Sequence, residues 1–176
     1  MWKEPEITAQ KYLDDDELCE LRRILDKFRE KDLRNTVLIE LALETAARAS
    51  ELLGILAGDI DHKTKSLYLR ALKKGKNRTY PLSREMYKRL KELSKDLRPE
   101  DRVFPVTYQR LHQIWMEYRP VKKKFHALRH TRAIEVYKKT KDIKIVQRIL
   151  GHRNLDMANV YLDFVHSDAE LRKALS

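Results

Sequence analysis

Apolar residues recur at helical spacing in the N-terminal third of the chain. Residues 15–31 predict a helix, because their apolar positions fall on one stripe and their acidic start suits the helix dipole. The stripe consists of Leu18, Leu21, Ile24, Leu25 and Phe28. Residues 35–47 contain the nearly unbroken apolar run VLIELAL, which predicts a second, buried helix. Ser50 is the expected cap of a short third helix, SELLGIL, that ends between Gly54 and Gly58.

The middle of the chain predicts a small sheet, and the remainder predicts helices. Residues 59–61, 66–71 and 78–81 are short β-like segments separated by polar turn residues. Ser83 is the expected cap of a helix over residues 84–97. Further helices are expected at residues 108–118, 126–139, 143–150, 156–164 and 168–175, with Gly151 as the left-handed residue that ends the helix 143–150. We therefore expect an α+β fold, mainly α, with an antiparallel sheet of two or three strands in one domain spanning residues 1–176.

Charge is distributed unevenly along the chain. The 176 residues carry a net charge of +11, but residues 1–61 hold 9 Lys/Arg against 15 Asp/Glu, whereas residues 62–176 hold 29 against 12. Such a basic segment indicates a surface that binds a polyanion such as nucleic acid. No apolar run approaches the roughly 20 residues of a membrane helix, and the one cysteine, Cys19, excludes a disulfide framework and a cysteine-based zinc site. We expect a cytoplasmic protein that does not bind membranes.

Two polar patches hold candidate functional residues that also have plain structural interpretations. Arg48 follows the buried helix, and its side chain could simply pair with Glu44 or Glu51. The basic turn KKGKNR, over residues 73–78, could be a solvated loop tip. Neither patch alone indicates a function.

Two further patches lie in the C-terminal third. His126 and His130 of the segment HALRH have the i, i+4 spacing of a zinc site, but Ala127 occupies the position where the zinc-protease motif needs a glutamate. No third ligand is evident, so no metal is expected. Tyr161 follows the segment LGH by nine residues. Taken alone, it is one of eight tyrosines in the chain, and its place on an apolar helix face is typical of a core residue.

Taken in order, however, the four patches resemble the catalytic domain of the tyrosine recombinase (phage integrase) family. The family's T-G-x-R-x-S-E-L-like segment is matched around Arg48, and its hairpin lysine by the KKGKNR turn. Its H-x-L-R-H-T motif is matched by residues 126–131, its L-G-H by residues 150–152, and its nucleophilic tyrosine by Tyr161. The pair Ala46–Ala47 departs from the family, which commonly has a glycine and an apolar residue there. The match covers about residues 12–164, nearly the whole chain.

The resemblance implies a site-specific DNA recombinase whose tyrosine attacks a phosphodiester and forms a 3′-phosphotyrosyl intermediate. Tyr161 is then the nucleophile, and Arg48 and Arg129 donate paired hydrogen bonds to the transition-state oxygens. His152 is a third donor and His126 is the expected base. Neither metal, ATP nor another cofactor is required, because cationic side chains stabilise the developing charge and the phosphotyrosyl bond stores the energy.

The remaining expected roles are less direct. Lys74 of the hairpin is the expected acid for the leaving oxygen, with Lys73 and Lys76 as alternatives. Glu51 and His130 are expected to support the catalytic residues. The expected DNA contacts are Lys73, Lys76, Arg78, Arg132 and Arg153.

The resemblance also implies partners and an organisation. Family members usually carry an N-terminal core-binding domain, which we expect to be absent here, with residues 1–11 as a linker or tail. The expected partners are double-stranded DNA, at the nucleoid, and other protomers that join a tetrameric synapse on DNA, the chain being a monomer in free solution. Two alternatives stay open: a type IB topoisomerase-like nicking and closing enzyme, and a non-catalytic DNA-binding domain.

Overall fold

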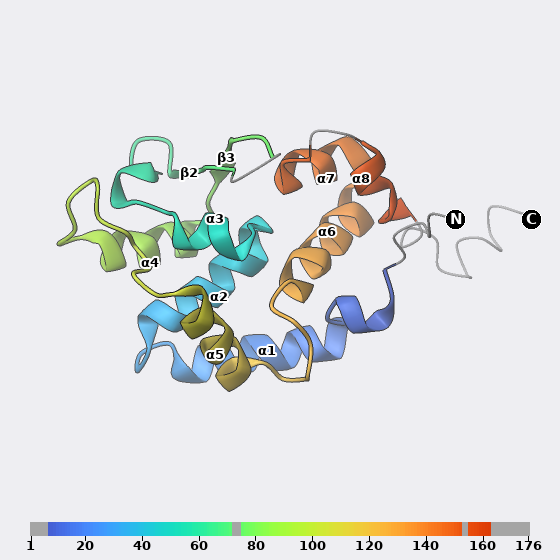
Figure 1. The fold of residues 1–176 in the computed structure, drawn as a ribbon, viewed down its shortest axis with the longest axis horizontal. Coiled ribbons are helices and arrows are strands. Elements are labelled where there is room, and N and C mark those ends of the chain that lie inside the picture. The colour runs from blue at the N-terminus through green and yellow to red at the C-terminus, as the bar shows by residue number, and fades with distance from the viewer. Residues whose placement is uncertain (1–6, 72–74, 153–154, 163–176) are drawn as a thin grey trace, which may run out of the picture.

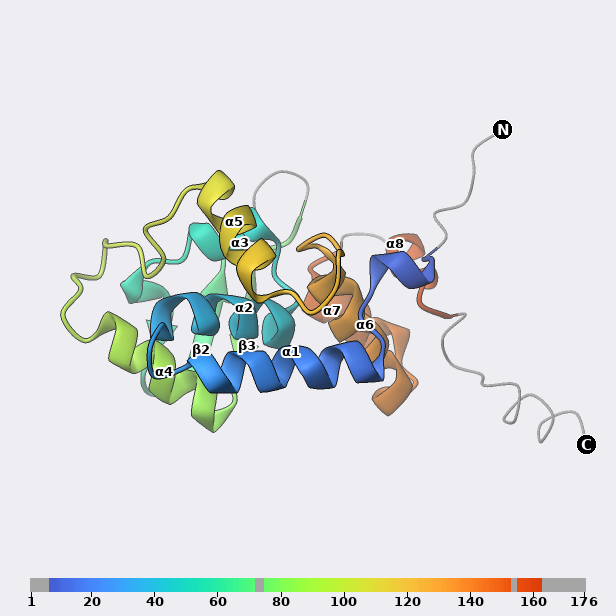
Figure 2. The same ribbon diagram turned by 90° about the horizontal axis from the view of Figure 1, so that it is seen from below.

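The computed structural model describes residues 7–71, 75–152 and 155–162. Helices dominate it; α7 and α8 lie toward one end, α4 lies toward the other, and β3 contacts α7 between them (Figure 1). The view turned by 90° shows α1 running along the underside of this arrangement (Figure 2). The elements are, in order, η1 Ala9–Lys11, α1 Asp15–Phe28, α2 Leu33–Thr45, α3 Ala49–Leu53, η2 Ala57–Asp59, β1 Ile60–Asp61, β2 Ser66–Leu69, β3 Arg78–Pro81, α4 Arg84–Ser94, α5 Tyr108–Tyr118, α6 Ala127–Thr140, α7 Ile143–Leu150 and α8 Asp156–Asn159. The expected mainly α fold with a small sheet is confirmed.

The sheet is a simple antiparallel meander of the strands β1, β2 and β3. β2 pairs with β3 over four residues, from Ser66 opposite Pro81 to Leu69 opposite Arg78. Arg78 and Tyr80 point inward on β3, while Thr79 and Pro81 are exposed. The hairpin between β2 and β3 therefore delivers one cation to the protein interior.

Several helix ends follow local chemistry that the sequence only partly predicted. Ser83 caps α4 through a hydrogen bond from the Met86 backbone N–H to its hydroxyl, as expected. Gly151 adopts the left-handed conformation, with φ of 62°, and ends α7 as expected. The expected cap at Ser50 is wrong: α3 already begins at Ala49, and the Glu51 carboxylate accepts the free backbone N–H of the preceding Arg48.

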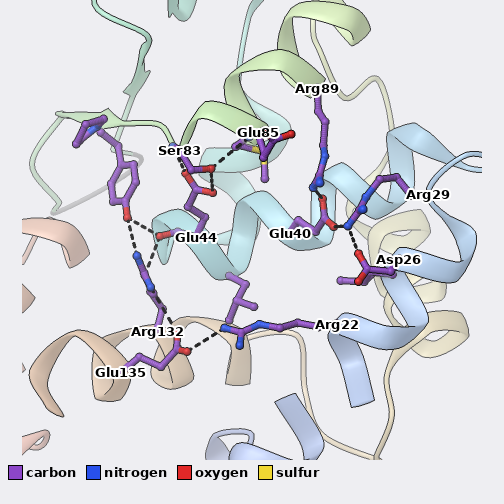
Figure 3. Close-up of a pocket in the computed structure, with 15 residues that line it drawn as sticks. Arg22, Asp26, Arg29, Glu40, Glu44, Ser83, Glu85, Arg89, Arg132 and Glu135 are labelled. Atoms are coloured by element: carbon purple, nitrogen blue, oxygen red, sulfur yellow. Dashed lines mark hydrogen bonds and ion pairs between the residues drawn. The ribbon is translucent and has the colours of Figure 1, made fainter. Parts of the chain in front are cut away.

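Ion pairs join α1, α2, α4 and α6 on one side of the molecule (Figure 3). Glu40 of α2 accepts from both Arg29 and Arg89, and Glu44 of the same helix accepts from the Ser83 hydroxyl and backbone N–H. Arg22 of α1 reaches Glu135 of α6 at 3.1 Å. These contacts surround a cleft of about 450 Å³.

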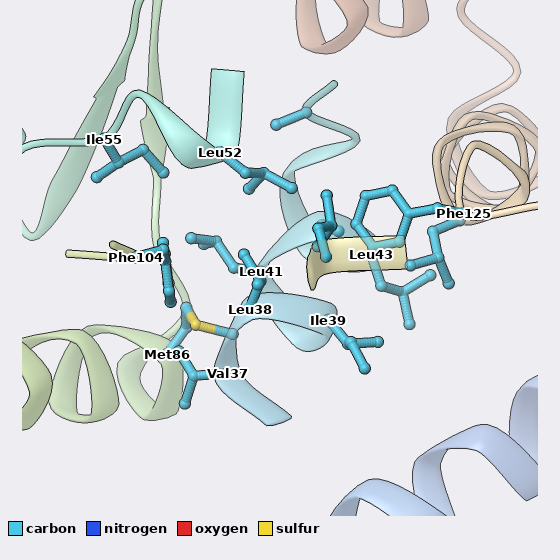
Figure 4. Packing of buried hydrophobic residues seen from close by; sticks show 14 of the residues in the cluster. Val37, Leu38, Ile39, Leu41, Leu43, Leu52, Ile55, Met86, Phe104 and Phe125 are labelled. Carbon is cyan, nitrogen blue, oxygen red and sulfur yellow. The ribbon is translucent and has the colours of Figure 1, made fainter. Parts of the chain in front are cut away.

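The described residues form two hydrophobic clusters. The larger one surrounds α2, whose residues Val37, Leu38, Ile39 and Leu41 are fully buried against the other helices and the sheet (Figure 4). The smaller one consists of Ala46, Ala133, Ile134, Tyr137, Val146, Leu150, Ala158 and Tyr161, from the end of α2 and from the region of α6 to α8. No helix in the described parts of the chain combines the length and apolar character needed to cross a bilayer.

Candidate active site

One cavity of about 770 Å³ collects five of the six expected catalytic residues, and His130, from separate parts of the sequence. Its walls come from η1, the start of α3, the segment before α6, α6 itself, and the region after α7. The candidates that line it are Arg48, His126, Arg129, His130, His152 and Tyr161. Residues far apart in the sequence thus share one site.

The first arginine is held by a buried carboxylate. Arg48 Nη1 donates to Glu51 Oε1 at 3.0 Å, so the interpretation that pairs Arg48 with Glu51 rather than with Glu44 is correct. Arg78 Nη2 donates to Glu51 Oε2, also at 3.0 Å. The Glu51 side chain is fully buried, which by itself raises its pKa, but the hydrogen bond and the charge of Arg78 outweigh burial and hold the pKa below the usual value. Glu51 is therefore an anion that fixes two guanidinium groups.

The second arginine ties together the ends of two helices. Arg129 is 3% exposed; its Nη1 donates to the carbonyl of Ala46 at 2.5 Å and its Nη2 to the carbonyl of Leu150 at 2.8 Å. Ala46 adopts a left-handed conformation, with φ of 54°, just after α2. Burial and the neighbouring charge of Arg48 lower the pKa of Arg129 to about 9, which still leaves the group cationic at neutral pH. The Ala46 position, where the family commonly has glycine, therefore serves the placement of Arg129.

The same guanidinium sets the protonation of His152. Arg129 Nη2 lies 3.0 Å from His152 Nε2, and a guanidinium only donates, so Nε2 accepts and the ring proton resides on Nδ1. Burial, followed by the charges of Arg129 and Arg48, lowers the pKa of His152 to about 4, which keeps the ring neutral. His152 Nδ1 is buried and has no partner within the described structure. It is therefore a buried N–H donor that no described group satisfies.

The tyrosine hydroxyl contacts His130 rather than His126. Tyr161 is 2% exposed, and its hydroxyl lies 2.9 Å from His130 Nδ1. Burial lowers the pKa of His130 to about 4 and raises that of Tyr161 to about 12, so the neutral ring accepts a hydrogen bond from a protonated phenol. The His126 ring packs edge-on against His130, with centroids 4.8 Å apart. His130, expected to be a supporting residue, thus contacts the Tyr161 hydroxyl, and the expected base His126 packs behind it.

Gly75 and Lys76, which lead into β3, lie beside the arginine layer, the name used here for Arg48, Arg78 and Arg129. A Cβ at Gly75 would lie 3.5 Å from Arg48 Nη1, and the backbone N–H of Lys76 donates to the carbonyl of Gly151. The expected acid Lys74 and the expected DNA contacts Lys73 and Arg153 lie outside the described residues. The described part of the hairpin therefore places the turn glycine beside Arg48.

Arg132 does not reach the cavity. Its Nε donates to the carbonyl of Glu44, its Nη2 to the hydroxyl of Tyr80, and its Nη1 pairs with Glu135 (Figure 3). These partners line the cleft on the α1–α4 side of the molecule. Its donors join α6 to α2 and β3, and the DNA contact expected of Arg132 stays a prediction.

The cavity also contains basic residues that were not singled out from the sequence. Lys122, Lys123 and Lys124 line it just before α6, and Lys123 pairs with Glu17. The run KKK immediately before FHALRH was a signal that could have found them. Within the described ranges, no three His, Cys, Asp or Glu side chains converge as a metal site would require.

Comparisons with known proteins agree with this geometry. A sequence profile of the Phage integrase family matches residues 11–168. Tyrosine recombinase XerA of Saccharolobus solfataricus is 30% identical over 156 residues, which cover 83% of this chain and 52% of the relative. The chain spans about half the length of the curated relatives it matches first.

Solved structures show the same fold. The catalytic domain of bacteriophage HP1 integrase superposes with a TM-score of 0.66 at 24% identity, covering 93% of this chain and 92% of that one. A post-cleavage complex of XerH site-specific recombinase with palindromic difH substrate superposes with a TM-score of 0.69 at 25% identity, covering 99% of this chain and 53% of that one. The profile, the curated relative and the fold together show that this chain belongs to the phage integrase family.

Proposed function

We propose that this chain is the catalytic part of a site-specific DNA recombinase that cleaves and rejoins DNA through Tyr161. The observation that carries the proposal is the contact of the buried Tyr161 hydroxyl with His130, inside a cavity that also holds Arg48, Arg129 and His152. Recombinases among its relatives, including a XerH complex named for its difH substrate, support DNA as the partner.

In the proposed reaction, the Tyr161 oxygen attacks a phosphodiester and forms an O–P bond as the bond to the 5′ oxygen breaks. The phenol must lose its proton during attack, because a pKa of about 12 leaves it protonated at neutral pH. His130 Nδ1 is placed to accept that proton. Lys74 donates a proton to the leaving 5′ oxygen. In religation, a second 5′ hydroxyl attacks the phosphotyrosine, and the two proton transfers run in reverse.

The phosphate itself supplies part of the activation. Its negative charge, held near His126 and His130, favours the protonated imidazole and raises the basicity of His130 only when DNA is bound. Arg48 and Arg129 offset the charge that develops on the non-bridging oxygens, and the Nδ1–H of His152 donates a further hydrogen bond.

We further propose that the free chain is a monomer and that protomers assemble into a synapse only on DNA, at the nucleoid.

The test is covalent trapping on suicide DNA. A pool of nicked duplexes with randomised sequence around the nick is incubated with the protein, and covalent adducts are isolated under denaturing conditions and sequenced. We expect adducts with a common sequence, their loss in Tyr161→Phe, and their retention in Tyr137→Phe, which alters a buried tyrosine of the same hydrophobic cluster. Adduct from Tyr161→Phe at wild-type yield would refute the proposal, and site-independent relaxation of supercoiled plasmid would indicate a nicking and closing enzyme instead.

A further inference from the structure

A second hollow lies beside the catalytic cavity, between β3 and α7. It has a volume of about 460 Å³ and is lined by Lys76, Asn77, Arg78, Thr79, Lys144, Gln147, Arg148, Gly151 and His152. Four of these residues are cationic and none is acidic. His152 also lines the catalytic cavity, so the two hollows are neighbours that share this residue.

The cations of this hollow come from two elements. Lys144 and Arg148 are four residues apart on α7 and therefore share a face of that helix, and both are exposed. Lys76, from the hairpin, is exposed as well. The three side chains form an open rim suited to an anion.

The floor of the hollow contains an incompletely paired arginine. Arg78 is 9% exposed, and only its Nη2 has a partner, Glu51, while its Nε and Nη1 have none among the described residues. Its Nη1 lies against the backbone of Gly151, where an added Cβ would approach it to 3.0 Å. Unpaired buried N–H groups are costly, and an anion in the adjoining hollow lowers that cost.

The charges around the hollow also favour an anion. Of the three guanidinium groups near Glu51, those of Arg78 and Arg129 are buried, whereas the Arg48 side chain is 30% exposed. The Glu51 carboxylate offsets one of the two buried positive charges. No acidic side chain lines the hollow to offset its four cations, so an anion bound there lowers the electrostatic cost on the Arg78 side.

We propose that the hollow between β3 and α7 is a second phosphate site, which holds the DNA backbone phosphate adjacent to the one that Tyr161 attacks. This proposal rests on the proposed function, because both phosphates belong to the same strand. Lys144, Arg148 and Lys76 contact the phosphate directly, and Arg78 stabilises its charge from below. The site fixes the strand on the far side of His152 and so positions the scissile phosphate.

The test is a double-mutant cycle between protein and DNA. Once adduct sequencing has located the cleaved bond, each neighbouring phosphate is replaced in turn by a neutral methylphosphonate, and the affinity of the wild-type protein is compared with that of Lys144→Ala/Arg148→Ala. At one adjacent phosphate, we expect the replacement to weaken wild-type binding about tenfold, because a charged hydrogen bond is lost. The same replacement should change the affinity of the variant by less than about twofold. Lys91→Ala, which removes one exposed charge on α4 at the opposite end of the molecule, is the control for loss of a distant surface charge and keeps the wild-type response (Figure 1).

Salt dependence gives a second readout. Because the two α7 side chains contact one phosphate, their joint removal lowers the slope of log affinity against log salt by about one, whereas Lys91→Ala leaves the slope unchanged. Equal responses of the variant and wild type to methylphosphonate at every adjacent position, or an unchanged salt slope, would overturn the second phosphate site. If the second phosphate site fails this test but covalent adduct still forms at Tyr161, the proposed function stands. Failure of the second site and failure of the proposed function are therefore distinguishable.

Discussion

Removing the buried negative charge of Glu51 tests the arginine layer most directly. The two oxygens of Glu51 accept from Arg48 N, Arg48 Nη1 and Arg78 Nη2. Glu51→Gln keeps the shape but places an amide NH₂ against at least one of these donors. It also leaves two arginines without their counter-ion.

The expected magnitude follows from burial. Breaking one side of a buried ion pair costs about 3–5 kcal/mol of unfolding free energy, which corresponds to a loss of roughly 6–20 °C in Tm for a chain of this size. Glu40 is a matched control, since it also bridges two arginines, Arg29 and Arg89, but its side chain is 14% exposed and theirs are 32% and 21% exposed. Glu40→Gln is expected to cost about 1 kcal/mol or less, because solvent screens its pairs.

Urea unfolding followed by circular dichroism measures both costs. The folded pKa of Glu51 is depressed, so its contribution is present above the ordinary glutamate pKa and is lost as pH falls through the lower folded value. Wild type should therefore lose stability relative to Glu51→Gln below about pH 4.3. Equal costs for Glu51→Gln and Glu40→Gln, at pH 7, would refute the argument that the buried carboxylate holds the layer together.

Three further outcomes are expected. Arg48→Lys and Arg129→Lys should each lower the rate of adduct formation about 10²–10³-fold. Of the two, only Arg129→Lys should also lower Tm, because Arg129 donates hydrogen bonds to two helix-end carbonyls. A lysine variant that cleaves at the wild-type rate would contradict the paired-donor role. His130 and His152 have folded pKa values of about 4, below the unfolded value, so the free energy of unfolding should fall as pH drops from about 6.5 to 4. In acid denaturation, this free energy should fall less steeply with pH in His130→Gln than in wild type. DNA affinity, measured by filter binding, should decrease steeply with salt concentration, because residues 62–176 hold 29 Lys/Arg against 12 Asp/Glu. An affinity that does not change with salt would show that the basic surface does not contact DNA.

Helical periodicity located most elements of the fold. Residues 108–118 and 143–150 were predicted with the bounds that α5 and α7 have, because a threonine cap and a glycine mark their ends. Residues 15–31 and 84–97 were predicted too long, since α1 ends at Phe28 and α4 ends at Ser94, five residues before Pro99, the proline expected to end it. The expected helix 168–175 lies outside the described residues.

The composition of the site was predictable, but its internal contacts were not. Motif order was enough to bring Arg48, Arg129, His152 and Tyr161 into one cavity. The i, i+4 spacing puts His126 and His130 on one face of α6, and only the position of the segment after α7 decides which ring meets the hydroxyl. The pairing of Arg78 with Glu51 depends on strand register, which the segments of four residues did not specify.

Tyr161 belongs to the smaller of the two hydrophobic clusters. Tyr161 packs with residues of α6, α7 and α8, whereas α2 lies at the centre of the larger cluster. Regions that bury less apolar surface open locally at a lower free energy than the whole molecule. Backbone amides of α7 should therefore exchange with deuterium sooner than those of α2, and each opening event separates Tyr161 from His130 while the rest of the protein stays folded.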